Sequence, residues 1–322
     1  MEENCTQLRS IPIEPTLEAS AEHRRSGLHN MVEGQAASFL RFAQKVLYFG
    51  LYLLAGISSK QYVTILVYHS VDENDSFYSV TQKEFVKQIE YLSKNYHVVS
   101  LDDVLDFVIS KRDLPRRSVA ITFDDGYYDN YLNAYPRAKK YGFPIAIFVA
   151  SGFVGKAMSL GKVPIKMLSW DELVEMSRNK VTIGAHTVGH PDLRQVDRRE
   201  AEDQIEKCKA DIESAIGLPV VYFAYPKGSY NRSLFELLHD KGFKVAFATG
   251  DGIVQRGDNH YSLKRVSMDA SVSFIMFKAR LTVAVEWYGK IERAGGHFVR
   301  KFPFLAGIAS IYNEREKNPL GY

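Results

Sequence analysis

The sequence predicts an α/β protein built on a distorted barrel of about seven or eight parallel strands, a (β/α)7-8 barrel, with helical extensions at both ends. From residue 64 onward, short runs rich in valine, isoleucine and phenylalanine alternate with amphipathic stretches. This pattern is typical of parallel strands that are buried on both faces and joined by helices. About seven such runs suit a barrel related to the (β/α)8 type better than an open sheet.

Length and composition fit one such domain with extensions. The chain has 322 residues, of which 46% are hydrophobic and 12% aromatic, enough for a sizeable core. A net charge of +3, from 41 basic and 38 acidic residues, argues against nucleic-acid binding. Cys5 and Cys208 fit neither a zinc-binding spacing nor a disulfide framework. The sequence is therefore compatible with a reducing compartment and equally with export.

Two segments precede the predicted barrel. Residues 1–36 are polar without periodicity and are interpreted as a poorly ordered tail. Residues 37–62 contain an apolar helix whose uncharged part, after Lys45, is about a dozen residues long, whereas a membrane-spanning helix needs ~20. Three interpretations stay open for it: a helix buried against the domain, a helix at the membrane interface, and a signal sequence in an unusual position.

The barrel is predicted over residues 63–270. Seven strands are expected, each a short apolar run: Thr64–Tyr68, His97–Ser100, Ser118–Phe123, Pro144–Ala150, Val181–Ala185, Val220–Ala224 and Lys244–Ala248. Helices are expected between them, where apolar residues recur at helical spacing: Gln82–Ser93, Leu101–Val108, Tyr131–Tyr141, Trp170–Ser177, Arg198–Ile216 and Leu234–Lys241.

Residues 271–322 are predicted to form a C-terminal helical extension. Its last part, from His297 to Tyr312, is first basic and aromatic and then apolar. This stretch fits a helix packed on the barrel wall, and it fits contact with an anionic membrane surface equally well.

Acidic residues and histidines follow two of the predicted strands. Asp124 and Asp125 come directly after the third strand, and His186 and His190 follow the fifth. Barrels of this type carry their chemistry at the C-terminal ends of the strands. Two histidines and one carboxylate can bind an ion and leave a position open for water, which indicates a hydrolytic site. Taken singly, an aspartate pair is usually a cap or turn and a histidine is usually structural, so the combination carries this hypothesis.

These motifs resemble the polysaccharide deacetylase (NodB-like, carbohydrate esterase 4) family. The matching runs are Thr122-Phe-Asp-Asp-Gly-Tyr127, His186-Thr-Val-Gly-His190 and Phe223-Ala-Tyr-Pro-Lys-Gly228, supported by Leu66-Val-Tyr-His69 and Leu168-Ser-Trp-Asp-Glu-Leu173. The resemblance extends over about residues 64–266 and implies a barrel of the NodB-homology type. The Phe-Ala-Tyr-Pro run is similar to the branch that includes poly-N-acetylglucosamine deacetylases.

The resemblance also implies roles for single residues. Asp125, His186 and His190 correspond to metal ligands, and Asp124 corresponds to the general base that takes a proton from water. The implied cofactor is a divalent ion, Zn²⁺ first, with Co²⁺ or Ni²⁺ as alternatives because such a site accepts several metals.

The turn from Tyr225 to Gly228 has a second implied role. By resemblance, the backbone N–H of Lys227 donates a hydrogen bond to the tetrahedral oxyanion, while Tyr225, Pro226 and Tyr127 contact the sugar. The alternative is an ordinary Pro-Gly turn.

The sequence departs from the family pattern in two places. Ala224 stands where many members carry an arginine that orients the catalytic aspartate; Arg265 is the candidate replacement, with a surface arginine as the alternative. A late Leu-x-His motif, the usual source of the general acid, is missing from the sequence. His69 is the candidate acid, with a structural histidine as the alternative.

The sequence therefore favours a metal-dependent hydrolase that removes N-acetyl groups from an N-acetylglucosamine-type glycan and releases acetate. A second hypothesis is deacetylation or deformylation of a lipid-linked amino sugar at the membrane surface, which the apolar segments at both ends favour slightly. A third, from another class, is a catalytically silent glycan-binding module, against which the intact site residues argue. The expected partners are a glycan or lipid-linked sugar, with peripheral membrane contact and no nucleic acid.

Overall fold

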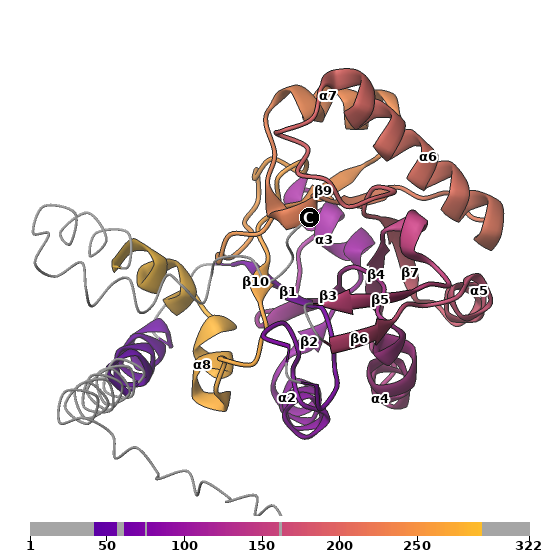
Figure 1. Ribbon diagram of the computed structural model, residues 1–322. Coiled ribbons are helices and arrows are strands. Elements are labelled where there is room, and N and C mark those ends of the chain that lie inside the picture. Colours follow the sequence, from indigo (N-terminus) through magenta and orange to yellow (C-terminus); the bar gives the residue numbers. More distant parts are fainter. Residues whose placement is uncertain (1–41, 57–60, 75, 161–162, 292–322) are drawn as a thin grey trace, which may run out of the picture. The chain divides into compact units, whose positions relative to one another are not determined.

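Short parallel strands form the centre of the structure (Figure 1). The computed structural model describes residues 42–56, 61–74, 76–160 and 163–291, and those from Lys45 onward belong to one compact unit. The tail predicted over residues 1–36 and the stretch from His297 to Tyr312 lie outside the described residues.

One main sheet and one hairpin contain the strands of the described part of the chain. These strands are β1 (Val63–Tyr68), β2 (His97–Val98), β3 (Ser118–Phe123), β4 (Ile145–Val149), β5 (Ala157–Leu160), β6 (Val163–Lys166), β7 (Thr182–Ala185), β8 (Tyr222–Ala224), β9 (Val245–Phe247) and β10 (Val266–Ser267). The main sheet has eight strands in the order β10-β1-β3-β4-β7-β8-β9, with β2 paired to β3, and its pairings are parallel. Strands β5 and β6 form the antiparallel hairpin, which the sequence analysis did not anticipate.

The main sheet curls, and one short segment bridges its two ends. Leu263 pairs with Phe247 of β9, while Val266 and Ser267 pair with β1. Few pairings join the two ends of the sheet among the described residues, so the barrel is incompletely closed. The predicted α/β fold with a distorted barrel is confirmed as a curled parallel sheet with flanking helices.

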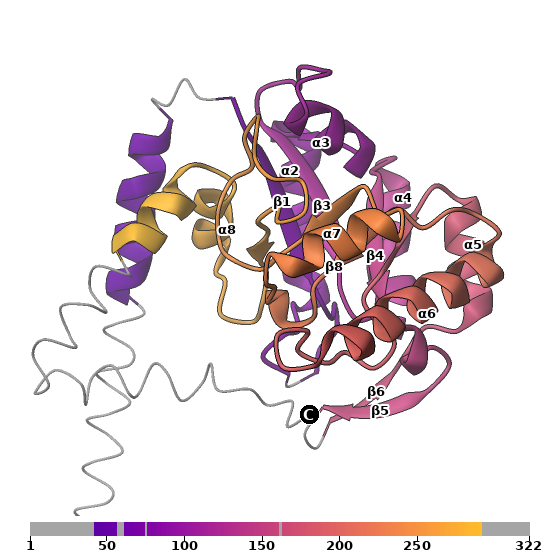
Figure 2. The ribbon, with the colours of Figure 1, turned by 90° about the horizontal axis from the view of Figure 1, so that it is seen from above.

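Helices follow the strands and flank the sheet (Figure 2). They are α2 (Gln82–Asn95), α3 (Leu101–Val108), α4 (Tyr135–Lys140), α5 (Trp170–Arg178), α6 (Arg198–Ile216), α7 (Ser233–Asp240) and α8 (Phe274–Arg280). Four begin at a residue whose side chain accepts a hydrogen bond from the first turn, namely Thr81, Ser100, Ser169 and Asp197. The helix expected over Tyr131–Tyr141 starts differently, with a π-helical turn over Asn130–Ala134 before α4.

The two faces of the sheet belong to two apolar cores. Alternate strand residues such as Ile65, Phe148 and Phe247 form the inner core together with α3. Their neighbours along the strands, such as Leu66 and Phe223, form the outer core with the remaining helices. Both faces are buried, which explains why β1 and β3 read as continuous apolar runs.

The strand register places the predicted site residues at one edge of the sheet. Tyr68 at the end of β1 lies opposite Phe123 at the end of β3, and the N–H of Asp124 continues the pairing by donating to the Tyr68 carbonyl at 2.9 Å. In the same way, the N–H of His186 donates to the Val149 carbonyl at 3.0 Å. The residues that directly follow β1, β3 and β7 therefore converge at the C-terminal edge.

The apolar segment before the barrel is helical over residues 42–55, of which residues 45–55 belong to the same compact unit as the barrel. Tyr48 is buried and its ring stacks on Tyr288 with centroids 4.1 Å apart. The opposite side is open: Val46, Leu53 and Leu54 are each more than half exposed. Among the described residues, no helix is long and apolar enough to span a membrane. The helix thus packs by one side and leaves an apolar side uncovered by the described residues.

Candidate metal centre

Asp125, His186 and His190 converge on one point. The Oδ1 atom of Asp125 lies 3.4 Å from the Nε2 atom of each histidine, and the three potential ligand atoms lie within 4.8 Å of one another. Within the described part of the chain, this buried Oδ1 atom accepts no hydrogen bond. A buried carboxylate oxygen without a donor, facing two imidazole nitrogens, fits a divalent cation.

The turn after β3 presents Asp125 to this point. Asp125 adopts a φ of 68° and Gly126 a φ of 79°, so the chain reverses sharply beyond Asp124. A Cβ atom at Gly126 would lie 2.4 Å from Cγ1 of Val149. Glycine is therefore required here both for the backbone conformation and for the close approach to β4.

The ring of His186 is fixed by a backbone carbonyl. Its Nδ1–H donates to the Ala224 carbonyl at 2.7 Å, because a carbonyl oxygen can only accept. The Nε2 lone pair is thereby directed toward Asp125, in the arrangement usual for metal-bound histidines. His190 is held differently: Thr187 Oγ1 accepts a hydrogen bond from the His190 backbone N–H at 3.0 Å.

The charge states of Asp125 and His190 suit a cation. Burial acts to raise the pKa of Asp125, but the two histidines outweigh it and hold that pKa well below its usual range. Burial lowers the pKa of His190 to about 4, so this imidazole is neutral near neutral pH and its lone pair is free to bind. For His186, burial acts to lower the pKa, but Asp125 and Asp124 outweigh burial and raise it, so a cation would have to displace a proton from this ring.

Asp124 is paired with Arg265, which is completely buried. The guanidinium donates to Asp124 Oδ1 at 2.7 Å and to Oδ2 at 2.6 Å, and it also donates to Thr122 Oγ1 at 3.2 Å. The rings of Phe148 and Phe247 enclose it, with centroids 5.4 and 5.7 Å from the guanidinium carbon. Burial acts to raise the pKa of Asp124, but Arg265 and then His186 lower it. Arg265 is therefore not a surface arginine, and Asp124 is ionised.

His69 lies at the same edge of the sheet. It is close enough to Asp124 and Asp125 to help lower the pKa of both carboxyl groups. Its ring packs against Tyr78 with centroids 5.2 Å apart. The carbonyl of His69 accepts a hydrogen bond from Asn130 Nδ2 at 2.7 Å. The position suits a proton donor, the role that the sequence suggested for it.

Two residues that support His69 were missed by the sequence analysis. Asp129 accepts hydrogen bonds from the Val71 N–H at 2.9 Å and from Ser70 Oγ at 2.8 Å. Together with Asn130 it fixes the chain that follows β1. Asp129 and Asn130 lie at the start of the π-helical turn, just beyond the Asp124-Asp125 pair. No sequence pattern predicted that turn.

The turn after β8 differs in part from expectation. The hydroxyl of Tyr225 donates to the Tyr261 carbonyl at 2.9 Å, and the side chain has no exposed surface. Tyr225 is therefore a buried residue in this structure, and its contact with the sugar stays a prediction. Tyr222 and Ala224 face the inner core, so strand alternation turns Tyr225 outward, into the core beneath the helices. Pro226 is buried as well, and its contact with the sugar also stays a prediction.

Lys227 and Tyr127 keep positions compatible with their proposed roles. Lys227 adopts a φ of 57°, and its backbone N–H has no acceptor among the described residues. Tyr127 is buried beside Ile165 and Met167. Burial, followed by the neighbouring Asp125 carboxylate, raises the pKa of Tyr127.

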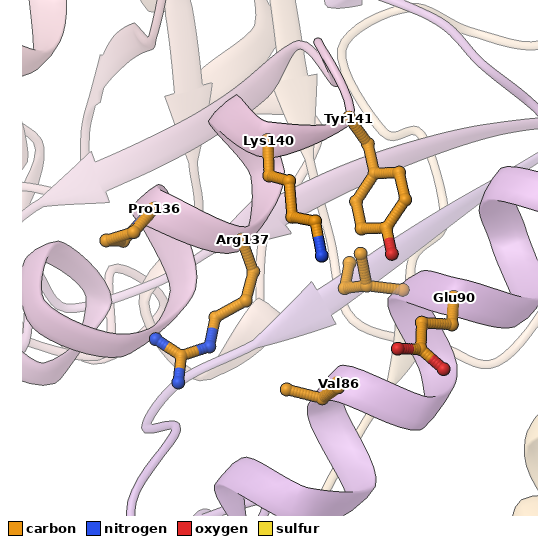
Figure 3. A pocket seen from close by; sticks show the side chains of 7 residues that line it. Val86, Glu90, Pro136, Arg137, Lys140 and Tyr141 are labelled. Atoms are coloured by element: carbon orange, nitrogen blue, oxygen red, sulfur yellow. The ribbon is translucent and has the colours of Figure 1, made fainter.

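A surface pocket of about 310 Å³ lies elsewhere, between α2 and α4 (Figure 3). Its lining residues are Val86, Ile89, Glu90, Pro136, Arg137, Lys140 and Tyr141. None of the predicted site residues lines it, so it has no part in the chemistry considered for the metal centre.

Comparison with known proteins agrees with this geometry. Residues 111–246 match the model of the polysaccharide deacetylase family. A protein of Bacillus subtilis named as a polysaccharide deacetylase, YxkH, is 27% identical over 216 residues, which are 67% of this chain and 74% of that protein. The poly-beta-1,6-N-acetyl-D-glucosamine N-deacetylase of Staphylococcus aureus (strain N315) is 29% identical over 202 residues, 59% of this chain and 67% of that enzyme.

Solved structures share the fold. IcaB from Ammonifex degensii is 27% identical, with a TM-score of 0.60 over 69% of this chain and 97% of that one. The Streptococcus pyogenes deacetylase PplD, solved in complex with acetate, is 24% identical, with a TM-score of 0.59 over 66% and 94% of the two chains. The second likeness is one of fold alone.

Proposed function

We propose that this chain, whose residues 111–246 match the polysaccharide deacetylase family, hydrolyses the N-acetyl groups of an N-acetylglucosamine-type glycan and releases acetate. One observation supports this most directly. The orphaned Oδ1 atom of Asp125 faces two histidines, and the neighbouring Asp124 is clamped by Arg265. The set of potential metal ligands and a separate carboxylate base thus lie side by side, an arrangement that suits metal-assisted hydrolysis of an amide.

The metal would be held by Asp125, His186 and His190. Two nitrogens and one carboxylate oxygen suit Zn²⁺, with Co²⁺ and Ni²⁺ as alternatives. A divalent ion bound there would lower the pKa of water and polarise the amide carbonyl.

The protein's own residues would then move the protons. Asp124, kept ionised by Arg265, accepts a proton from the water whose oxygen attacks the acetyl carbon. The N–H of Lys227, which has no acceptor among the described residues, donates to the developing oxyanion. When the carbon–nitrogen bond breaks, the amine nitrogen takes a proton from His69, and acetate leaves.

A lipid-linked amino sugar is a second candidate substrate. The observation that favours it is the apolar side of helix 45–55, where Val46, Leu53 and Leu54 are 53, 59 and 56% exposed. An apolar helix face beside a basic residue such as Lys45 suits the headgroup boundary of a bilayer. Deacetylation or deformylation would then take place at the membrane surface.

Acetate release is the test. The purified protein, stripped of metal by chelation and then resupplied with Zn²⁺, is incubated with oligomers of β-1,6-linked N-acetylglucosamine, with β-1,4-linked oligomers for comparison. Acetate should appear only with metal, and Asp125→Ala should abolish it. A protein that binds the oligomers but releases no acetate with any of the three metals would be a binding module, which would refute the proposal.

A further inference from the structure

The short turn between the two histidine ligands is held by a side chain from α6. Gln204 lies in the second turn of α6, and its Oε1 atom accepts two backbone hydrogen bonds from that turn. The Val188 N–H donates at 3.1 Å and the Gly189 N–H at 2.8 Å. One side-chain oxygen thus satisfies both N–H groups at the centre of the turn.

The opposite side of the same turn is held by the backbone after β4. The N–H of Ser151 donates to the Thr187 carbonyl at 3.1 Å, and that of Gly152 donates to the Val188 carbonyl at 3.0 Å. A Cβ atom at Gly152 would lie 2.6 Å from the Val188 oxygen, so only glycine allows this approach. The turn is therefore clamped between a fixed backbone and the carboxamide of Gln204.

The turn needs such a clamp because its conformation is unfavourable. Thr187 and His190 adopt φ values of 66° and 58°, in the left-handed region that residues with a Cβ atom rarely occupy. Such conformations persist only where surrounding contacts determine them. The second of these residues is the one whose Nε2 atom must reach Asp125.

Helix α6 is anchored independently of Gln204. Ala201, Ile205 and Cys208 are buried in the outer core, and Asp211 accepts a hydrogen bond from Ser151 Oγ at 2.8 Å. Loss of the Gln204 carboxamide should therefore leave the helix in place and release the turn.

We propose that Gln204 is a positioning residue of the metal centre, which holds the 187–190 turn so that His190 Nε2 meets Asp125 and His186. The inference rests on the proposed metal-dependent function. Gln204 itself does not reach the ion, and it acts through the backbone of Val188 and Gly189. Outer groups of this kind commonly change metal affinity by about 10–100-fold when they are replaced.

Zinc affinity tests this proposal without a substrate. Gln204→Met removes the acceptor at nearly constant length, whereas Gln204→Glu keeps an oxygen in place. Lys207→Met is the matched control, because Lys207 is exposed on the same helix. The zinc dissociation constant is measured by competition with a chromophoric chelator, and the unfolding temperature is recorded with and without zinc.

Gln204→Met should weaken zinc binding about 10–100-fold, while its unfolding temperature without zinc stays near that of the wild type. Gln204→Glu should bind within a few-fold of the wild type, and Lys207→Met should be unchanged. If Gln204→Met does not fold, Gln204→Asn, which retracts the same carbonyl by one methylene, is judged by the same criterion.

Two results would overturn the inference alone: wild-type zinc affinity in Gln204→Met, or an equal loss of stability with and without zinc. A wild-type protein that binds no zinc, cobalt or nickel would instead overturn the metal centre, and the inference with it.

Discussion

Replacement of Arg265 by methionine should strongly destabilise the protein and shift its pH dependence. Arg265 is completely buried and makes two hydrogen bonds shorter than 3 Å to Asp124. Methionine fills much of the same space between the rings of Phe148 and Phe247 and packs well against aromatic groups. The change therefore removes mainly the charge and leaves Asp124 buried without a partner.

The expected cost is large for a single substitution. Charge-assisted hydrogen bonds contribute about 1.5–3 kcal/mol each, and removal of one partner from a buried ion pair costs about 3–5 kcal/mol. We expect the free energy of unfolding of Arg265→Met to fall by about 3–5 kcal/mol near neutral pH. An exposed ion pair would contribute only ~0–1 kcal/mol.

The sign of the pH effect follows from the pKa of Asp124. In the wild type this pKa lies below 3.8, so the pair stabilises the fold above that pH and the contribution is lost as pH falls through the folded-state pKa. Without Arg265, burial raises the pKa of Asp124 instead. The stability deficit should then shrink toward acid pH, and the acid limb of kcat/KM should move to higher pH.

Chemical denaturation of the metal-free proteins, followed by circular dichroism, measures the stability. Asp124→Asn and the double variant complete a mutant cycle, whose coupling energy isolates the pair. The pH profile is measured by acetate release. A cost below about 1 kcal/mol, or an acid limb that does not move, would refute the reasoning that Arg265 holds Asp124 ionised.

Four further outcomes are expected. Asp124→Asn should reduce kcat by about 10²–10⁴-fold with the zinc dissociation constant unchanged; near-normal kcat would point to another base. His69→Ala should slow release of acetate from N-acetylglucosamine far more than from an aryl acetate, whose leaving group needs no proton. Burial raises the pKa of Asp129 from 3.8 to about 6. The protonated form therefore stabilises the fold fully below pH 3.8, and this contribution is lost as the pH rises through about 6. In Asp129→Asn, the free energy of unfolding should change less over this pH range, by at most ~3 kcal/mol. Anionic liposomes should sediment the protein, and Val46→Ser combined with Leu53→Ser should weaken this; binding unaffected by the double variant would exclude the exposed helix face as the contact.

The fold could be predicted from the sequence because its strongest signals are local. Strands β1 and β3 are mostly apolar, and the aspartates and His186 stand just after strand ends. Parallel strands align their ends without further information, which brought Asp124 and His186 to one edge. The short β10 and the β5–β6 hairpin carry no comparable pattern, and both were missed.

The rest of the site depends on tertiary contacts that cannot be predicted from the spacing of residues in the sequence. Tyr225 directly follows β8, and its side chain lies in the outer core, which the motif alone did not indicate. Gln204 comes one helix later than the turn it holds, and a glutamine on a polar helix looks like any exposed residue. Such side-chain to backbone hydrogen bonds require the tertiary fold before they can be recognised.

The segment that bridges β9 and β1 has a consequence for where this protein can be cut. The family match ends at residue 246, whereas the bridge and Arg265 lie beyond it and β1 with His69 lies before it. A fragment with those limits would keep Asp125, His186 and His190, yet it would expose the edge of β3 and leave Asp124 without its counter-ion. The matched residues thus omit β1 and β10, which complete the main sheet. We expect a stable fragment to need at least the residues from β1 through β10.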